Sequence, residues 1–415
     1  MQDNHAENHR WAGLALDYAR RIAQLSPGRG SATQAERRAA EEVKGILLKK
    51  GIHDLQVQEF TGLRSFWLFI ALAFGMALTG HAAFWLLTRP TGMIASLVIC
   101  LSLFAFSGYL LWRKFTFRAY PLQMSLPHGP SQNVLAKVAP AQAARRQVVL
   151  VAHLDSHRAV WWFASDFLTR AMSMLTPAGI YGVFMAPFLY LLADLSGWMI
   201  FAYLALGLAG LHFIAWFTGV TADLGVYSPG ANDNASAVGS VLALAERLLQ
   251  QPLQHTEVWL AFTGCEETGC DGMRAMLEKY GEELHDALFL DFELVGIGDQ
   301  LAYLQSEGVI RPRRIPPELE QLVLRVGQDF AIQPLRAAQF GAFTETGVLW
   351  ERGHHGACVL MLRQGAMLLP EWHRLTDRSE RLEAGALEKA HQFAWKFLLT
   401  IDQDASETPA VQQAT

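Results

Sequence analysis

Four long apolar segments interrupt this chain of 415 residues and limit the ways in which it can fold. They cover residues 66–88, 93–112, 171–193 and 198–220, and they contain almost no charged side chains. A helix of about 20 apolar residues is long enough to cross the hydrocarbon core of a bilayer. The alternative, four buried helices of a large soluble enzyme, would place too much apolar surface in one core. We therefore expect two transmembrane helical hairpins, each made from one pair of segments.

The polar parts of the chain are expected to form one domain, because a hairpin returns to the side of the membrane on which it began. Hairpins at residues 65–117 and 161–220 would divide this domain into three parts, namely residues 1–64, 118–160 and 221–401. Residues 402–415 are mostly polar and are expected to form a disordered tail.

Basic side chains beside the hairpins predict the orientation of the domain. Arg89 is the only basic residue in the hairpin turns, whereas the domain side carries Lys49, Lys50, Arg64, Arg113, Lys114, Arg118, Arg158 and Arg170. Positive residues concentrate on the cytoplasmic side of a membrane. We therefore expect a multi-pass protein of the cell inner membrane, with a cytoplasmic domain and the lipid bilayer as a partner. A net charge of −5 and the lack of other basic clusters argue against nucleic acid as a partner.

Metal-binding side chains follow short apolar runs that are typical of buried strands. Residues 148–152 lead into His153 and Asp155, which emerge at the carboxyl end of this predicted strand. Loops at that edge of an α/β sheet commonly carry the functional side chains. The second hairpin leaves the same loop, so we expect it to lie close to the functional site and substrates to approach along the bilayer surface.

Acidic side chains occupy two further loops. Asp233 lies in the sequence SPGANDNASAVGS, a turn that runs into a helical apolar pattern. Taken alone, Asp233 is explained as a turn or helix-capping residue. Glu266 and Glu267 follow the strand-like residues 258–262. Two adjacent carboxylates on one turn can divide the roles of metal ligand and general base.

Three more candidate ligands lie nearer the C-terminus. Asp291 and Glu293 follow the apolar residues 287–290. They would share one face of an extended segment, because side chains alternate with a period of two, and either could bind a metal. His373 lies in a loop before the predicted helix at residues 384–399.

Together these side chains have the composition of a site for two neighbouring zinc ions. Zinc binds imidazole nitrogen or carboxylate oxygen, and a catalytic zinc keeps a position open for water. Two neighbouring ions need about one histidine each, one terminal carboxylate each and one shared carboxylate. The chain offers His153, Asp233, Glu267, Glu293 (or Asp291) and His373. Cobalt and manganese accept the same types of ligand.

The sequences AHLDS, PGANDNASAVG, FTGCEETGCDG, FELVG and WHRLTD occur in this order and resemble the motifs of the co-catalytic di-zinc exopeptidase family. That family includes bacterial secreted leucine aminopeptidases, glutamate carboxypeptidases and glutaminyl cyclases. The resemblance implies that His153 and Glu293 bind one zinc. It implies that Glu267 and His373 bind the other, with Asp233 as the bridge between them.

The resemblance also implies catalytic roles for two carboxylates. Asp155 would orient His153 by a hydrogen bond to its ring. Glu266 would be the general base, which takes a proton from water and passes it to the leaving amine. In the family, the place of Glu293 is usually occupied by Asp, so this chain departs from the pattern but keeps the type of ligand.

These observations lead to one expected architecture and function. We expect a three-layer α/β/α zinc-peptidase domain with a mixed sheet, interrupted by two transmembrane helical hairpins. The expected activity is that of a membrane-anchored metallopeptidase with two zinc ions, an aminopeptidase acting on peptide or amide substrates. A glutaminyl cyclase or a non-peptide amide hydrolase on the same scaffold is an alternative. A non-catalytic metal-binding membrane scaffold is another, and the presence of Glu266 beside a ligand argues against it.

Overall fold

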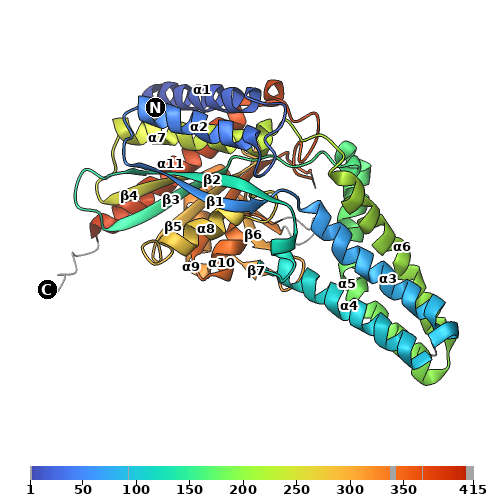
Figure 1. The fold of residues 1–415 in the computed structure, drawn as a ribbon. Coiled ribbons are helices and arrows are strands. Elements are labelled where there is room, and N and C mark those ends of the chain that lie inside the picture. Colours follow the sequence, from blue (N-terminus) through green and yellow to red (C-terminus); the bar gives the residue numbers. More distant parts are fainter. Residues whose placement is uncertain (1, 92, 337–342, 367, 408–415) are drawn as a thin grey trace.

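The computed structural model describes residues 2–91, 93–336, 343–366 and 368–407. These residues form one nine-stranded mixed sheet, which lies at the centre of the polar domain (Figure 1). The strands follow the order β1-β2-β4-β3-β5-β9-β6-β7, and β8 pairs with β6. Their bounds are β1 (Leu55–Leu63), β2 (His128–Val138), β3 (Arg146–His153), β4 (Thr256–Thr263), β5 (Leu288–Glu293), β6 (Gln300–Glu307), β7 (Arg313–Arg314), β8 (Gln333–Arg336) and β9 (His355–Leu362).

The middle of the sheet is parallel, and this places several strand ends at one edge. Strand β3 pairs in parallel with β4 and with β5, and β5 pairs in parallel with β9. These strands are continuous apolar runs because both of their faces are covered. On β3, for example, Val148 and Leu150 pack into one core, and Val149 and Val151 pack into another.

Helices cover both faces of the sheet. One face packs against α1 (Gln2–Gln24), α2 (Gln34–Lys49), α7 (Ser236–Gln250), α9 (Pro317–Gly327) and α11 (Ala384–Glu407). The other packs against the shorter helices α8 (Asp271–Tyr280) and α10 (Glu345–Glu351). This arrangement is the three-layer α/β/α fold with a mixed sheet that the sequence predicts. Short 3₁₀ helices connect the elements at Gln123–Ser125, Trp161–Ala164, Gln328–Phe330 and Ser379–Arg381.

The four apolar segments form long helices that extend away from the sheet domain as one bundle (Figure 1). They are α3 (Trp67–Thr91), α4 (Met93–Phe115), α5 (Asp166–Ser196) and α6 (Met199–Ala222). All four are long and apolar enough to cross a membrane, judged by length and composition. Helix α3 packs against α4 and α6, and α5 packs against α4 and α6. Large apolar side chains such as Phe188 and Tyr203 remain exposed on the outer faces of the bundle.

The C-terminal helix is longer than the sequence predicts. Residues 402–407 belong to α11 and are not a tail, while residues 408–415 lie outside the described part of the chain. Ile401 and Ala405 are buried on this last stretch of the helix. The carboxylate of Asp402 accepts hydrogen bonds from the backbone N–H groups of Gln254 and His255, both at 2.7 Å. Asp402 thus ties the end of the helix to the domain. The prediction of a tail was wrong for residues 402–407 because it assumed that polar residues in this segment are exposed to solvent.

Candidate metal centre

The sequence-predicted site residues come from five loops and strand ends at one edge of the sheet. His153 is the last residue of β3, Glu293 is the last residue of β5, and Glu267 follows β4. Asp233 lies in a short irregular turn, Ala231–Ala235, that directly precedes α7. His373 lies in the loop between β9 and α11. Each of these side chains is at least nine-tenths buried.

Asp233 lies between two histidine–glutamate pairs. Its Oδ1 is 3.4 Å from His153 Nε2, which is 3.3 Å from Glu293 Oε2. Its Oδ2 is 3.4 Å from His373 Nε2, which is 3.2 Å from Glu267 Oε2. The two oxygens of one carboxylate therefore face two separate sets of candidate ligands, which is the arrangement that a bridging ligand needs.

The structure distinguishes the two acidic residues of β5. Glu293 points at His153 and forms a compact group with His153 and Asp233. Asp291 is fully buried, but it belongs to none of the compact groups of candidate ligands among the described residues. Since its side chain lies two residues earlier on the same strand, it shares the face of Glu293 without reaching the cluster. The geometry thus favours Glu293 over its alternative.

Asp155 supports both the first histidine and the glutamate turn. Its Oδ1 is 3.4 Å from His153 Nδ1, and its backbone oxygen is 3.2 Å from the same nitrogen. Its carboxylate also accepts hydrogen bonds from the backbone N–H groups of Glu266 and Glu267, both at 3.1 Å, and from the hydroxyl of Ser31 at 2.5 Å. One buried carboxylate therefore fixes the ring of His153 with Nε2 toward the cluster and also fixes the turn that carries both glutamates.

Glu266 lies where the two sets of ligands meet. Its Oε2 is 3.9 Å from His153 Nε2, and it forms a compact group with His153 and Glu267. Its other oxygen accepts a weak hydrogen bond from the thiol of Cys270 at 3.5 Å. One oxygen thus remains directed at the cluster, as a group that exchanges protons there requires.

Asp377 holds the backbone of Asp233, a role that the sequence did not predict. Its carboxylate accepts hydrogen bonds from the N–H of Asn232 at 2.7 Å and from the N–H of Asp233 at 3.0 Å. Burial raises the pKa of Asp377 to about 7. The residue ends the motif WHRLTD, so a signal was present, but the sequence did not show which backbone groups it would contact.

Two asparagines on either side of Asp233 connect its turn to the neighbouring loops. The amide of Asn232 donates to the backbone oxygen of Pro370 and accepts from the N–H of Gly296. The amide of Asn234 donates to the oxygen of Phe292 and accepts from the N–H of Leu294, on either side of Glu293. The positions of Asp233 and of Glu293 are therefore fixed relative to one another by hydrogen bonds.

Arg29 is a second supporting residue that sequence reasoning missed. Its guanidinium is fully buried and donates to the backbone oxygens of Leu154, Pro229 and Gly230 at 2.7–3.0 Å. These oxygens belong to the loop after β3 and to the turn before Asp233. A guanidinium presents several donors in a fixed plane, which suits it to joining two loops. Nothing in the local sequence around residue 29 indicates this function.

His157 is a further histidine at the cluster. Its ring stacks on that of His373, with the ring centroids 3.7 Å apart, and it forms a compact group with Glu267 and His373. Its Nδ1 is 2.8 Å from the backbone oxygen of Arg158, so Nδ1 carries the proton in the neutral ring. Burial lowers the pKa of His157 well below its usual value, and the neighbouring His373 lowers it further. The residue directly follows the motif AHLDS, but no role was predicted for it from the sequence.

The charges of the cluster fit a bound cation. Burial raises the pKa of Glu266, Glu267 and Glu293, and neighbouring carboxylates raise each of them further. Burial lowers the pKa of His373 well below its usual value, so this imidazole is neutral, as a metal ligand must be. Buried ionised carboxylates are costly unless a positive charge lies beside them, and a divalent ion provides that charge.

Unpartnered polar atoms support the same conclusion. One oxygen each of Glu267 and Glu293 is buried and has no hydrogen-bond partner among the described residues. Buried polar atoms in proteins are normally satisfied, so such atoms indicate a missing partner. Imidazole nitrogen and carboxylate oxygen are ligands that zinc accepts, and the donor set therefore fits zinc.

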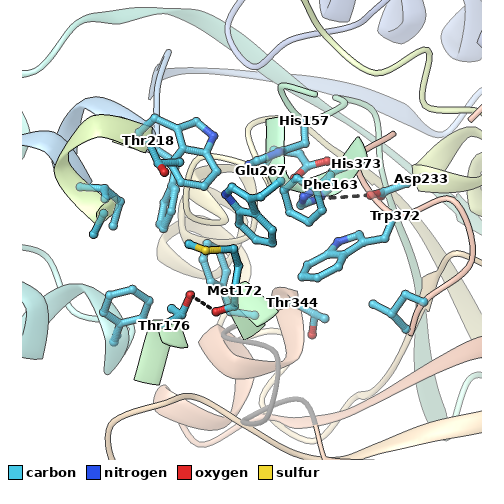
Figure 2. A pocket seen from close by; sticks show the side chains of 18 of the residues that line it. His157, Phe163, Met172, Thr176, Thr218, Asp233, Glu267, Thr344, Trp372 and His373 are labelled. Atoms are coloured by element: carbon cyan, nitrogen blue, oxygen red, sulfur yellow. Dashed lines mark hydrogen bonds and ion pairs between the residues drawn. The ribbon is translucent and has the colours of Figure 1, made fainter. Parts of the chain in front are cut away.

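The metal-facing side chains form one end of a cavity of about 170 Å³. Figure 2 shows His157, Asp233, Glu267 and His373 grouped on one side of this cavity. The indole of Trp372 and the side chain of Phe163 lie beside them (Figure 2).

Solved structures with the same fold include enzymes of two kinds. A glutaminyl cyclase of Bacteroides thetaiotaomicron, bound to N-acetylhistamine, has a TM-score of 0.55 and 13% identity, and the match covers 94% of this chain and 97% of that chain. A zinc aminopeptidase from Bacillus subtilis has a TM-score of 0.54 and 12% identity over 94% and 95% of the two chains. A Zn-dependent exopeptidase from Parabacteroides distasonis has a TM-score of 0.53 and 12% identity over 94% and 97%. At these identities the likeness shows a shared fold. No curated protein sequence matches the chain significantly.

The sequence itself matches one family of enzymes. Residues 212–398 match the sequence model of the family described as Peptidase family M28. The matched segment contains the turn of Asp233, the glutamate turn, the end of β5 and the loop of His373. Four of the five loops and strand ends that build the cluster lie wholly within it, and the shared fold extends over the rest of the domain. Over residues 212–398 the chain is therefore similar to Peptidase family M28, and this match together with the zinc-enzyme neighbours supports a zinc-dependent metallopeptidase.

Proposed function

We propose that this protein is a membrane-anchored aminopeptidase that uses two zinc ions. The observation that carries the proposal is the position of Asp233, whose two oxygens lie at 3.4 Å from His153 and from His373. His153, Glu293 and Asp233 would hold one ion, and His373, Glu267 and Asp233 would hold the other. A single zinc ion needs at most about four protein ligands, so this set of five candidate ligands supports two ions.

The residues around the ions have separate tasks in hydrolysis. When bound, zinc polarises the scissile carbonyl and lowers the pKa of water. Glu266 takes a proton from the attacking water and gives it to the nitrogen of the leaving amine. Its buried position and raised pKa suit both halves of this transfer, because a carboxyl with a pKa nearer neutrality can accept and release a proton at working pH. Asp155 keeps His153 and Glu266 in place through contacts to both.

A free amino terminus suits the charge of this site better than a blocked one. Glu266, Glu267 and Glu293 are at least nine-tenths buried, and the described lining of the cavity contains no Lys or Arg. With both ions bound, the charges of Glu267 and Glu293 are offset, and Glu266 is the carboxylate that would attract a substrate ammonium group. An N-acylated substrate lacks that charge. This argument favours removal of N-terminal residues over cleavage inside a chain.

The bundle of α3, α4, α5 and α6 would anchor the enzyme in the membrane. We propose that residues 65–117 and 161–220 are the two transmembrane hairpins, and that the peptidase domain combines the three polar parts of the chain. The basic residues beside the hairpins support a domain on the cytoplasmic side of the cell inner membrane.

Hydrolysis of aminoacyl fluorogenic amides tests the proposed function. The purified full chain would be assayed on a panel of these amides and on their N-acetylated forms, before chelation, after chelation and after return of zinc. We expect zinc-dependent cleavage of the unblocked amides alone. The variant Glu266→Gln should bind zinc like the parent and lose at least about 100-fold of its turnover, the size of a general-base contribution.

Other results would point to the alternatives. Release of ammonia from N-terminal glutaminyl peptides, without cleavage of a peptide bond, would indicate a glutaminyl cyclase. Cleavage of the N-acetylated amides alone would indicate an amide hydrolase of another specificity. Two bound zinc ions with no turnover on the whole panel would indicate a binding or scaffold protein. Glu266→Gln with full turnover would remove Glu266 from the mechanism.

A further inference from the structure

The cavity that begins at the metal-facing side chains continues between the candidate membrane helices. On the domain side it is lined by His153, Asp233, Glu266, Glu267, Glu293 and His373. On the far side it is lined by α3, α5 and α6, with residues such as Ile70, Met172, Gly179 and Leu211. Figure 2 shows Thr176 and Thr218, from α5 and α6, on the opposite side of the cavity from Asp233 and His373.

The walls of the far part of the cavity are apolar. Aromatic side chains that include Phe66, Trp67 and Trp162 surround its middle, and aliphatic side chains line the part between the helices. Among the described lining residues, the charged groups are the four carboxylates of the metal cluster. The hydroxyl of Thr176 donates to the backbone oxygen of Met172 at 2.8 Å, within its own helix.

These walls determine the chemistry of an occupant. A peptide backbone placed there would meet few partners, namely the hydroxyl of Thr218 and the indole N–H groups of Trp67 and Trp162. Most of its N–H and C=O groups would be unpaired, which costs several kcal/mol for each group in an apolar medium. An alkyl chain has no such groups and gains free energy from every methylene that leaves water. The far part of the cavity therefore fits a long apolar chain whose polar end lies at the metal cluster.

The position of the cavity indicates where such a chain comes from. Leu175 of α5 lines the cavity and is 37% exposed. The neighbouring Met174 is 70% exposed, and Phe213 on α6 is 52% exposed. Such surfaces on long apolar helices are suited to contact with lipid tails.

We propose that the cavity binds the long apolar side chain of the residue whose amide bond is cleaved, and that such substrates enter from the lipid phase. The substrate class is then peptides or aminoacyl amides that have a strongly apolar N-terminal residue and are dissolved in the membrane. The identity of the cleaved bond rests on the proposed aminopeptidase function. The occupancy of the cavity by an alkyl chain does not.

Binding of straight-chain alkyl hydroxamic acids tests the occupant without any turnover. The hydroxamate group binds zinc, and its alkyl chain, from acetohydroxamate to a dodecanoyl chain, would extend into the cavity. Affinity would be measured by calorimetry on the zinc-loaded full chain in lipid nanodiscs, with the aqueous ligand concentration corrected for partition into empty nanodiscs. Affinity should rise roughly four-fold with each methylene until the cavity is filled.

Gly179→Leu is the blocking variant. A Cβ at Gly179 would lie 3.9 Å from Leu211 Cβ and 4.0 Å from Phe74 Cε1, which is ordinary contact, so a leucine occupies cavity space without a backbone clash. Ala215→Leu narrows the cavity independently from α6. Gly210→Leu is the matched control, because Gly210 is exposed on α6 and its Cβ would meet nothing within 4 Å.

The expected and the opposing outcomes are distinct. Gly179→Leu and Ala215→Leu should bind acetohydroxamate like the parent and bind the decanoyl compound at least ten-fold more weakly, while Gly210→Leu should follow the parent throughout. The proposal is overturned if long chains bind the parent no better than acetohydroxamate, or if the blocking variants follow the parent at every length. A failure of the aminoacyl amide assay with an intact dependence on chain length would reject the proposed peptidase activity and leave the cavity assignment standing.

Discussion

Asp377 offers the sharpest test of how this site is built, because it contacts the backbone of Asp233 and belongs to none of the groups of candidate ligands among the described residues. Its carboxylate accepts two adjacent N–H groups, from Asn232 at 2.7 Å and from Asp233 at 3.0 Å. In the variant Asp377→Asn, the side-chain amide has one oxygen, which can accept a hydrogen bond from one of the two backbone N–H groups. Its NH₂ group would face the other N–H group and cannot accept from it. One buried donor thus loses its partner.

The loss of this one hydrogen bond sets the size of the expected decrease in zinc affinity. A buried donor without a partner costs about 1–3 kcal/mol. If this cost falls on the form of the turn that binds metal, zinc affinity decreases by roughly 5- to 150-fold. The same range is typical of residues that orient metal ligands. Zinc affinity would be measured by competition with a fluorescent chelator, on the full chain in detergent.

Asp402 provides a matched control within the same chain. Its carboxylate also accepts two adjacent backbone N–H groups, from Gln254 and His255, both at 2.7 Å, but at the end of α11. Asp402→Asn should lower the free energy of unfolding by a similar amount and leave zinc affinity unchanged. Equal zinc affinity in Asp377→Asn and the parent, or an equal loss in both variants, would refute the role of Asp377 as a positioning residue.

Two further predictions concern the ligands and the buried charges. Asp233→Asn should lose both zinc ions, whereas Glu293→Gln should lose one and keep the other, as measured by metal analysis after dialysis; one ion at full occupancy in Asp233→Asn would contradict the bridging role. Burial raises the pKa of Glu307 to about 8, so the folded protein holds this proton more tightly than the unfolded chain, and the resulting stability is present below about pH 4.3 and is lost as pH rises toward 8. Glu307→Gln can still pair with Thr344 and Thr346 but does not titrate. In chemical denaturation of the metal-free protein, the parent should therefore lose more unfolding free energy between pH 5 and 8 than this variant, by at most about 4 kcal/mol. An unchanged slope would show that Glu307 is ionised at neutral pH.

The parts of the site that follow strands could be predicted from the sequence, because a buried strand has a local signature. The apolar run of β3 ends at His153, and the run of β4 ends just before the glutamate turn. Parallel pairing then brings these ends to one edge. The four long apolar helices have an equally local signature in their length and composition.

The supporting residues could not be predicted, because their partners are remote in the sequence and irregular in structure. Arg29 contacts an oxygen 125 residues away and two others about 200 residues away. Residues 231–235 leave the regular helical path, with Asp233 at φ −113° and ψ 86°. The backbone N–H groups of this turn are therefore free to donate to Asp377. Neither feature has a periodicity from which it could be recognised. The end of α11 was mispredicted for the same reason, since Asp402 is polar but is paired within the fold.

The helical bundle packs directly against the loops of the candidate metal centre, so it is more than a membrane anchor. Phe163, at the start of the second hairpin, packs edge-on against His373 with ring centroids 4.6 Å apart. At the end of α4, the ammonium group of Lys114 donates to the backbone oxygen of Thr268 at 2.6 Å, and Thr268 directly follows the glutamate turn. Both hairpins therefore contact loops that carry candidate ligands. The helices form one wall of the cavity and also support these loops. A shift of the bundle would therefore alter both the shape of the apolar cavity and the positions of the candidate metal ligands. A flexible membrane tether could not couple the two in this way.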